Sequence, residues 1–272
     1  MKRTFLSLLL ILGQPLAAKN SIDGAAPIAN VSCEHVRELG ICKTPEDLKD
    51  WFSYHTITEF SISLNMDGKK EIVALTKFSD DITAKILNDL RSLLSIQGST
   101  ATPLHKKFFG DGPLDGLSYL AYVMRVHDIF EYDASMVSSA PFLQAGIDRI
   151  YFGKSYFYSS FPLVVRLSAL IHEAVHNDTS EADQLCPVPF LDEKGRDKIT
   201  LYGKVKLEGL PACADKYDGP YGRQVVMLKN IEKYCESCDE KMRLEAGRFA
   251  NELLERFISM EAKKALIDDF SK

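Results

Sequence analysis

The stretch FPLVVRLSALIHEAVHN, residues 161–177, predicts the helix on which the fold depends. Ser160 is suited to cap its start, and Pro162 suits the first turn, where a helix leaves the backbone N–H unused. Apolar side chains recur every three or four positions along one face, at Leu163, Leu167, Leu170 and Ala174. The residues NDTS, 177–180, favour a helix end. We therefore expect a core-packed helix that stops just after its last histidine.

This helix carries two histidines and a glutamate in the pattern His-Glu-x-x-His. Residues four apart differ by about 40° of rotation, so His172 and His176 face the same way, one turn apart. Glu173 lies about 100° round the helix from His172. It therefore flanks an ion held by the histidines and can take a proton from an attacking water. The alternative is a core helix with two hydrogen-bonded histidines, and the cost of burying Glu173 unpaired argues against it. The pattern predicts a Zn²⁺ site with Glu173 as general base.

A catalytic zinc ion needs a third protein ligand and one open position. No histidine follows His176, so this ligand has to be a carboxylate or a cysteine. Asp178 stands two residues beyond His176, where a chain leaving the helix can fold back towards the metal. Glu181 and Asp183 follow closely and are further candidates, although acidic residues in such loops are more often turn residues or caps.

A second motif suggests another candidate by resemblance. The segment resembles the aspzincins, deuterolysin-like zinc endopeptidases whose His-Glu-x-x-His is followed by Asp-x-x-Tyr-Gly. Residues 218–222, DGPYG, match that second element, and RIYFGKSYF, 149–157, looks like the strand before the catalytic helix. The resemblance implies that Asp218 is the third zinc ligand and that Tyr221 donates a hydrogen bond to the developing oxyanion. The gap between the two motifs, residues 177–217, is longer than in that family.

The rest of the chain predicts an α+β fold, with a small mixed sheet, a catalytic helix and a helical C-terminal part. Together with the resemblance, this implies a zincin-like architecture. The expected elements are a hairpin over 58–78 turning at Asp67-Gly68, helices over 79–95, 222–235 and 239–270, and a strand within 146–161. The apolar segment 116–132 suits either a helix or a buried strand, and we favour a helix. The Gly/Pro/Ser/Thr-rich stretch 97–115 is the best internal boundary. We expect an N-terminal α+β region over 19–115, which is a module, a propeptide or part of the same domain, and a zinc metallopeptidase-like domain over 116–272.

The first residues have the layout of a secretory signal peptide. Lys2 and Arg3 precede an apolar run over residues 5–12, and small residues follow at Ala17 and Ala18. The run is too short to span a bilayer comfortably. We expect a signal peptide over residues 1–18, cleavage near Ala18, and a secreted or periplasmic protein.

Export changes the interpretation of the cysteines, which number six. An even count in an oxidising compartment favours disulfides. Six cysteines allow 15 connectivities, and the sequence alone does not choose among them. Local spacing favours Cys33–Cys42, and a Cys186–Cys213 bond would close a loop just beyond the histidines. Cys235 and Cys238 have the spacing of a redox or zinc pair, but without a second such pair a local disulfide is the better prediction.

Composition limits the partners. The formal net charge of −5 provides no basic surface for nucleic acid. No further apolar stretch is long enough to span a membrane once the signal peptide is removed. We expect an exported zinc metallopeptidase that acts on a protein or peptide substrate. The alternatives are a zinc amidase acting on cell-wall peptide and a non-catalytic exported binding protein with a structural zinc.

Overall fold

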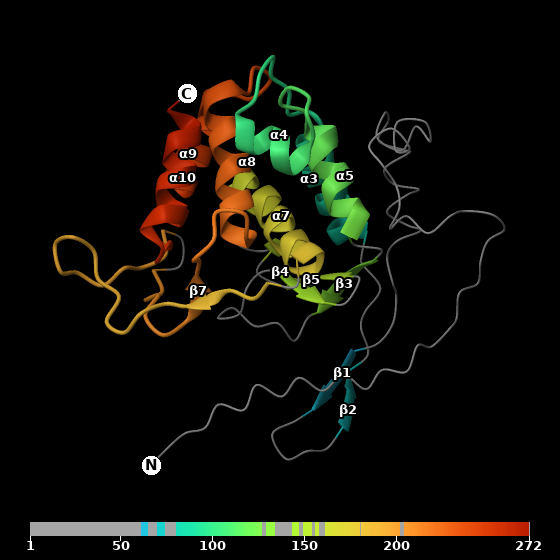
Figure 1. The fold of residues 1–272 in the computed structure, drawn as a ribbon. Helices are drawn as coiled ribbons and strands as arrows, with labels where there is room; N and C mark the ends of the chain where they lie inside the picture. Colours follow the sequence, from blue (N-terminus) through green and yellow to red (C-terminus); the bar gives the residue numbers. More distant parts are fainter. Residues whose placement is uncertain are drawn as a thin grey trace, which may run out of the picture.

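The computed structural model describes residues 61–64, 70–73, 80–126, 129–133, 143–146, 149–153, 156–157, 161–179, 181–201 and 204–271. The helices are α3 (Asp80–Leu94), α4 (Pro103–Phe109), α5 (Gly116–Val126), α7 (Leu163–Thr179), α8 (Pro220–Tyr234), α9 (Glu240–Leu254) and α10 (Met260–Phe270). The strands are β1 (Ser61–Leu64), β2 (Lys70–Val73), β3 (Ile129–Asp133), β4 (Leu143–Gly146), β5 (Arg149–Gly153), β6 (Gln184–Leu185) and β7 (Pro211–Cys213). The predicted α+β class is confirmed, with more helix than strand (Figure 1). The predicted signal peptide, residues 1–18, lies outside the described residues.

Three strands form a small mixed sheet with β5 in the middle. β3 runs parallel to β5, with Ile129 opposite Arg149, and β4 runs antiparallel to β5, with Leu143 opposite Phe152. The predicted strand within 146–161 is therefore confirmed as β5. The helix predicted over 116–132 is right only as far as Val126. Residues 129–133 form β3 instead, because their β-branched and aromatic side chains suit a strand paired with β5.

The predicted helix 161–177 is confirmed as α7, which passes through the middle of the core (Figure 1). Every residue from Val164 to Val175 except Arg166 is buried. α7 contacts α3 and α5 on one side, α8 and α9 on another, and the strands β4 and β5. A helix surrounded in this way is buried all round rather than on one stripe. The two histidines therefore stand at the end of a helix that is packed on several sides.

The helices α3 and α4 share this core. Ile86, Leu90 and Leu93 of α3 are buried in the same apolar cluster as α7 and α8. Polar groups also link α4 to the C-terminal helices. The backbone N–H of Thr102 donates to Asn230 at 2.9 Å, and that of Leu104 donates to Asp269 at 2.9 Å. The boundary predicted within 97–115 therefore does not separate two cores among the described residues.

A buried ion pair joins α3 to the start of α7. Arg166 makes two hydrogen bonds to the Asp89 carboxylate, Nη2 to Oδ1 at 2.7 Å and Nε to Oδ2 at 2.8 Å. The Tyr156 hydroxyl donates to Asp89 Oδ2 at 2.9 Å. In this bidentate geometry each charged group has hydrogen-bond partners, which a charge removed from water needs.

The C-terminal segment forms two helices, so the prediction of one helix over 239–270 is wrong. α9 begins at the cap Asp239, whose side chain accepts from the N–H of Met242, and it ends at Leu254. The chain then bonds to the segment after β7: the Ala214 N–H donates to the Arg256 carbonyl at 3.1 Å, and the Ile258 N–H donates to the Ala214 carbonyl at 2.9 Å. These tertiary bonds replace the intrahelical ones at the junction of α9 and α10.

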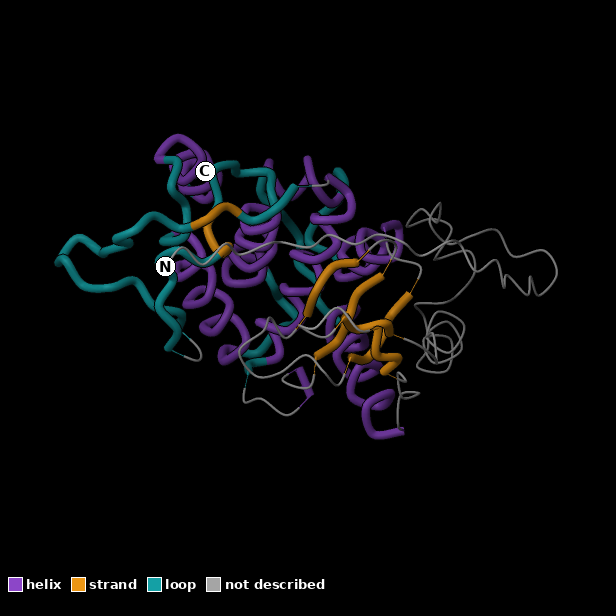
Figure 2. Tube along the Cα trace, turned by 90° about the horizontal axis from the view of Figure 1, so that it is seen from below, coloured by secondary structure: helices purple, strands orange, loops and turns teal. Residues whose placement is uncertain are grey.

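Two disulfides lie in the described part of the chain. Cys186–Cys213 joins β6 to β7 and closes the long connection between them, and Cys235–Cys238 closes the turn between α8 and α9. Both are among the pairs that the sequence suggested, whereas Cys33 and Cys42 lie outside the described residues. Figure 2 shows the long connection as a teal loop that extends from the helical body. Disulfides are typical of proteins in oxidising compartments.

The predicted hairpin over 58–78 is confirmed as the antiparallel pair β1–β2, with Ser61 opposite Val73. Its predicted turn at Asp67-Gly68 lies outside the described residues. Within the described ranges, no helix combines the length and apolar character that crossing a bilayer would need.

Candidate metal centre

The two histidines of α7 face each other at its C-terminal end. Their Nε2 atoms lie 3.1 Å apart, and their ring centroids 4.8 Å apart. The one-turn spacing predicted from the helix period is therefore realised in the structure. His172 is buried and His176 is half-buried, so the pair lies where the helix end approaches the surface.

The carboxylate of Asp183 completes this group. Asp183 Oδ2 lies 3.4 Å from His172 Nε2, and Asp183 Oδ1 lies 3.7 Å from His176 Nε2. Among the residues that the structure describes, these three form the one group whose ligand atoms converge as a metal site requires. Of the acidic residues that the sequence offered as a third ligand, Asp183 is the one that lies beside both histidines.

A turn after α7 brings Asp183 back to the histidines. The Thr179 hydroxyl donates to the Val175 carbonyl at 2.8 Å and accepts from the Glu181 N–H at 3.3 Å. The Glu181 carbonyl in turn lies 2.5 Å from His176 Nδ1. The chain is thus held against the helix end two residues before Asp183, and pairing of β6 with β7 holds it one residue after.

The bond to Glu181 also decides the protonation of His176. A carbonyl oxygen only accepts hydrogen bonds, so Nδ1 carries the proton when this imidazole is neutral. Nε2 is then unprotonated, and its lone pair points at His172 and Asp183. This arrangement, in which one ring nitrogen is occupied by a carbonyl and the other is free, is how proteins orient a metal-binding histidine.

The separations within the group suit a small tetrahedral ion. Zinc binds nitrogen and oxygen ligands at about 2.0–2.2 Å, so neighbouring ligands of a tetrahedral site lie about 3.3–3.5 Å apart. The three separations of 3.1, 3.4 and 3.7 Å lie around that value. Asp183 Oδ1 is also buried without a hydrogen-bond partner among the described residues. Two imidazoles and a carboxylate with this spacing fit zinc.

The electrostatics of the group depend on burial and on the facing charges. Burial works against a charged His172, but Asp183 and then Glu173 outweigh it and raise the pKa of His172 above its ordinary value. Burial likewise opposes ionisation of Asp183, and His172 together with His176 outweighs it and lowers the pKa of Asp183. Each partner therefore favours the charged form of the other, as expected for a carboxylate facing imidazoles.

Glu173 and Tyr221, the two residues predicted to be catalytic, both lie next to His172. Glu173 is 8 % exposed, and its charge acts on both His172 and Tyr221. Tyr221 is buried, and its ring centroid lies 4.5 Å from that of His172. The structure thus brings both predicted catalytic residues to the histidines, and their roles remain predictions.

The other two predicted ligands have different surroundings. Asp178 accepts from the Tyr122 hydroxyl at 2.9 Å and pairs with Arg223 Nη1 at 3.1 Å. Asp218 is not part of the metal-binding group, and its main-chain carbonyl accepts from Arg223 Nε at 2.9 Å. In the structure Asp183, rather than Asp178 or Asp218, lies beside the histidines. α7 continues through Asp178 to Thr179, so the helix period places Asp178 on the side away from His176, and Asp218 belongs to the turn that begins α8.

The motif DGPYG, residues 218–222, has a structural explanation of its own. Gly219 is the N-cap of α8 and Pro220 occupies its first turn. A Cβ at Gly222 would lie 1.9 Å from the Tyr217 carbonyl oxygen, so a side chain does not fit there. The motif therefore starts a helix closely against the preceding turn, and it directs Tyr221 towards His172.

Sequence reasoning missed a buried ion pair behind Tyr221. Arg256 Nη1 donates to the Tyr221 hydroxyl oxygen at 3.1 Å, and Glu252 Oε1 accepts from Arg256 Nη2 at 2.5 Å. The available signal was the presence of two opposite charges, four residues apart, next to the apolar face of α9. That spacing is common on exposed helices, so it did not mark a site.

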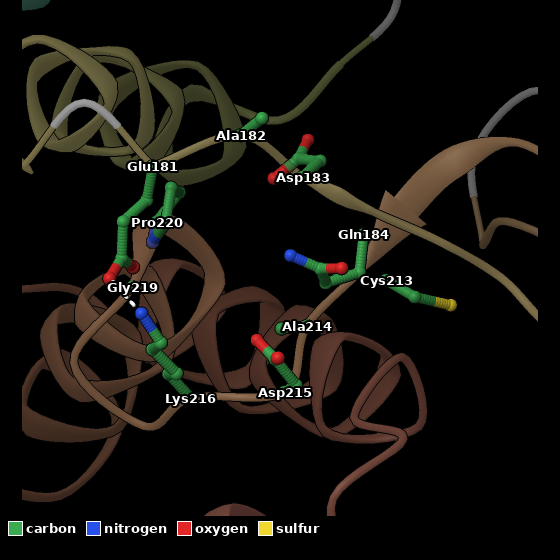
Figure 3. Close-up of a pocket in the computed structure, with 10 residues that line it drawn as sticks. All are labelled: Glu181, Ala182, Asp183, Gln184, Cys213, Ala214, Asp215, Lys216, Gly219 and Pro220. Atoms are coloured by element: carbon green, nitrogen blue, oxygen red, sulfur yellow. Dashed lines mark hydrogen bonds and ion pairs between the residues drawn. The ribbon is translucent and has the colours of Figure 1, made fainter.

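A pocket of about 230 Å³ opens beside Asp183. It is lined by residues 181–184 on one side and by residues 213–216 and 219–220 on the other. Figure 3 shows Asp183 and Gln184 across from Asp215, with Lys216 reaching Glu181. The Lys216 Nζ lies 2.5 Å from Glu181 Oε1. Asp183, one residue of the metal-binding group, therefore borders a space large enough for part of a small substrate.

No protein-family model matches this chain, and no curated protein or solved structure matches it. The aspzincin resemblance stays a prediction from the residues that carry it.

Proposed function

We propose that this protein is a zinc-dependent hydrolase of amide bonds, a zincin-like metallopeptidase whose third ligand is Asp183. The observation that carries the proposal is the convergence of His172, His176 and Asp183 at separations of 3.1–3.7 Å. Three protein ligands leave one position open, as catalytic zinc sites do. Glu173 follows the first ligand and its charge acts on His172, so a carboxylate that can serve as general base is available beside the proposed metal.

Zinc held there would supply a Lewis acid that polarises a carbonyl and lowers the pKa of water. The residues of the chain perform the remaining steps. The Glu173 carboxylate accepts a proton from the attacking water and returns it to the leaving nitrogen. The Tyr221 hydroxyl donates a hydrogen bond to the carbonyl oxygen as negative charge develops on it. His176 is kept in the required tautomer by the Glu181 carbonyl.

The substrate we propose is a protein or peptide. The pocket beside Asp183 gives room for a side chain next to the scissile bond, and its walls offer carboxylates and an amide rather than a continuous apolar surface. The two disulfides suit a protein that works outside the cytosol.

The test is Glu173→Gln, measured for zinc content and for hydrolysis of an unfolded protein and of peptidoglycan. Glutamine has nearly the same shape but cannot accept the proton. The variant should keep about one zinc per chain and lose roughly 10²–10⁴-fold in turnover. If the native protein and the variant hydrolyse equally with zinc bound in both, a structural zinc in a binding protein is the better conclusion. Activity on peptidoglycan alone identifies the cell-wall amidase.

A second set of variants tests the ligands. Asp183→Asn should lose most of the zinc, whereas Asp178→Asn and Asp218→Asn should keep it. These two are matched controls, since each removes one negative charge from the same region. Zinc retained by Asp183→Asn and lost by Asp218→Asn would restore the ligand implied by the aspzincin resemblance.

A further inference from the structure

Arg256 and Glu252 form a buried ion pair that the proposed reaction does not use. Arg256 is 9 % exposed, and Glu252 Oε1 accepts two of its N–H groups, Nη2 at 2.5 Å and Nε at 3.0 Å. A buried ion pair adds little stability over well-packed apolar residues, so stability alone is a weak reason for placing one here. The third interaction of the guanidinium gives a better reason.

That third interaction is with Tyr221. Arg256 Nη1 donates to the Tyr221 hydroxyl oxygen at 3.1 Å, and the guanidinium carbon lies 5.2 Å from the centre of the ring. Since the phenolic oxygen accepts this bond, its own proton is directed elsewhere. The ring that carries this hydroxyl packs against His172 of the metal-binding group, with the two ring centroids 4.5 Å apart.

The charge of Arg256 also strengthens Tyr221 as a donor. Hydrogen bonds in a chain polarise one another, and the effect is larger in a buried site of low dielectric. A hydroxyl that accepts from a cation therefore donates more strongly through its own O–H. Glu252 occupies the other side of the guanidinium fork, so Arg256 has a single orientation in which it reaches Tyr221.

We propose that Arg256, held by Glu252, is a positioning residue that aims the Tyr221 hydroxyl at the reacting carbonyl. The proposal rests on the proposed function, because the aimed hydroxyl matters only if an oxyanion develops beside the metal. Arg256 itself touches neither substrate nor metal ligand. Its contribution should therefore pass through Tyr221 and vanish when the hydroxyl is absent.

The experiment removes both charges together. Arg256→Met alone would leave Glu252 buried without its cation, which is strongly destabilising. The paired variant Glu252→Gln with Arg256→Met avoids this. We expect its kcat to fall about 10–100-fold, the usual range for residues that orient a catalytic group from behind. KM should stay within about twofold, and zinc content should remain about one per chain.

The decisive comparison is in the Tyr221→Phe background, where the paired substitution should lower kcat by less than about twofold. A merely structural pair would give the same loss with and without the hydroxyl. The control is Asp89→Asn with Arg166→Met, which removes a buried pair at the other end of α7 and should leave kcat unchanged.

An unchanged kcat in the paired variant, or an equal loss in the Tyr221→Phe background, would overturn the proposal while the proposed function stands. A native protein that hydrolyses no amide, or does so independently of Glu173, would overturn the proposed function and this inference with it. The two failures are distinguished by the Glu173→Gln measurement.

Discussion

His105 makes the stability of this protein sensitive to mild acid. The side chain is completely buried on α4, where Nδ1 lies 3.1 Å from the Tyr119 hydroxyl. Nε2 has no hydrogen-bond partner within the described ranges. Burial, and to a lesser extent the charge of Lys106, lowers the pKa of His105 to about 4. The imidazole is therefore mostly neutral in the folded protein at pH 5 and above.

The magnitude follows from the two pKa values. The unfolded chain takes up a proton at an ordinary pKa of 6.5, whereas the folded chain does so near 4. As the pH falls between these values, the unfolded state binds more protons and the free energy of unfolding decreases. One pKa unit corresponds to about 1.4 kcal/mol, so the full loss is about 3 kcal/mol, of which about 2 kcal/mol is lost by pH 5.

The assay is urea unfolding of the metal-free protein from pH 7.5 to pH 5, compared with His105→Gln. Glutamine can still accept from Tyr119 but does not titrate, and every other ionisable group is common to both proteins. The native protein should lose about 2 kcal/mol more than the variant over this range. Parallel curves for the two proteins would refute the reasoning, since they would mean that His105 titrates alike in both states.

Three further predictions concern packing, charge and metal. Gly222→Ala should lower the free energy of unfolding by about 1–3 kcal/mol, because the added Cβ would lie 1.9 Å from the Tyr217 carbonyl oxygen, and an unchanged urea midpoint would contradict this contact. Arg166→Met should cost about 3–5 kcal/mol by leaving Asp89 buried without its cation, and Asp89→Asn added to it should restore part of the loss. Zinc at 100 times its dissociation constant should stabilise the native protein by about 2.7 kcal/mol in a thermal melt, and the same increase in Asp183→Asn would argue against Asp183 as a ligand.

The sequence by itself predicted the features that depend on neighbours along the chain. The apolar period of residues 161–177 predicted α7, and the helix period then placed His172 and His176 on one face. The strand β5 and the hairpin β1–β2 were also predicted from local alternation. An even cysteine count indicated disulfides, and the short spacing of Cys235 and Cys238 favoured the local bond that the structure contains. In each case the relevant geometry spans one or two turns, or one short loop.

Only the tertiary structure decided which acid meets the histidines. Asp178, Asp183 and Asp218 all follow His176, and chain distance favours the first of them. The turn at Thr179 and the pairing of β6 with β7 bring Asp183 back, while Arg223 binds Asp178. These contacts join segments that are separated in the sequence, and the local sequence does not show which of those segments will meet in space.

The same limit explains the two features of the C-terminal helices that the sequence did not predict. The apolar period runs on from α9 towards α10, but backbone bonds to Ala214, distant in sequence, interrupt the helix after Leu254. Arg256, which donates a hydrogen bond to Tyr221, lies in this interruption between α9 and α10. Local periodicity records which side chains are apolar. Where backbone groups of two segments distant in sequence form hydrogen bonds, these bonds decide the path of the chain. Such bonds exist only in the folded structure.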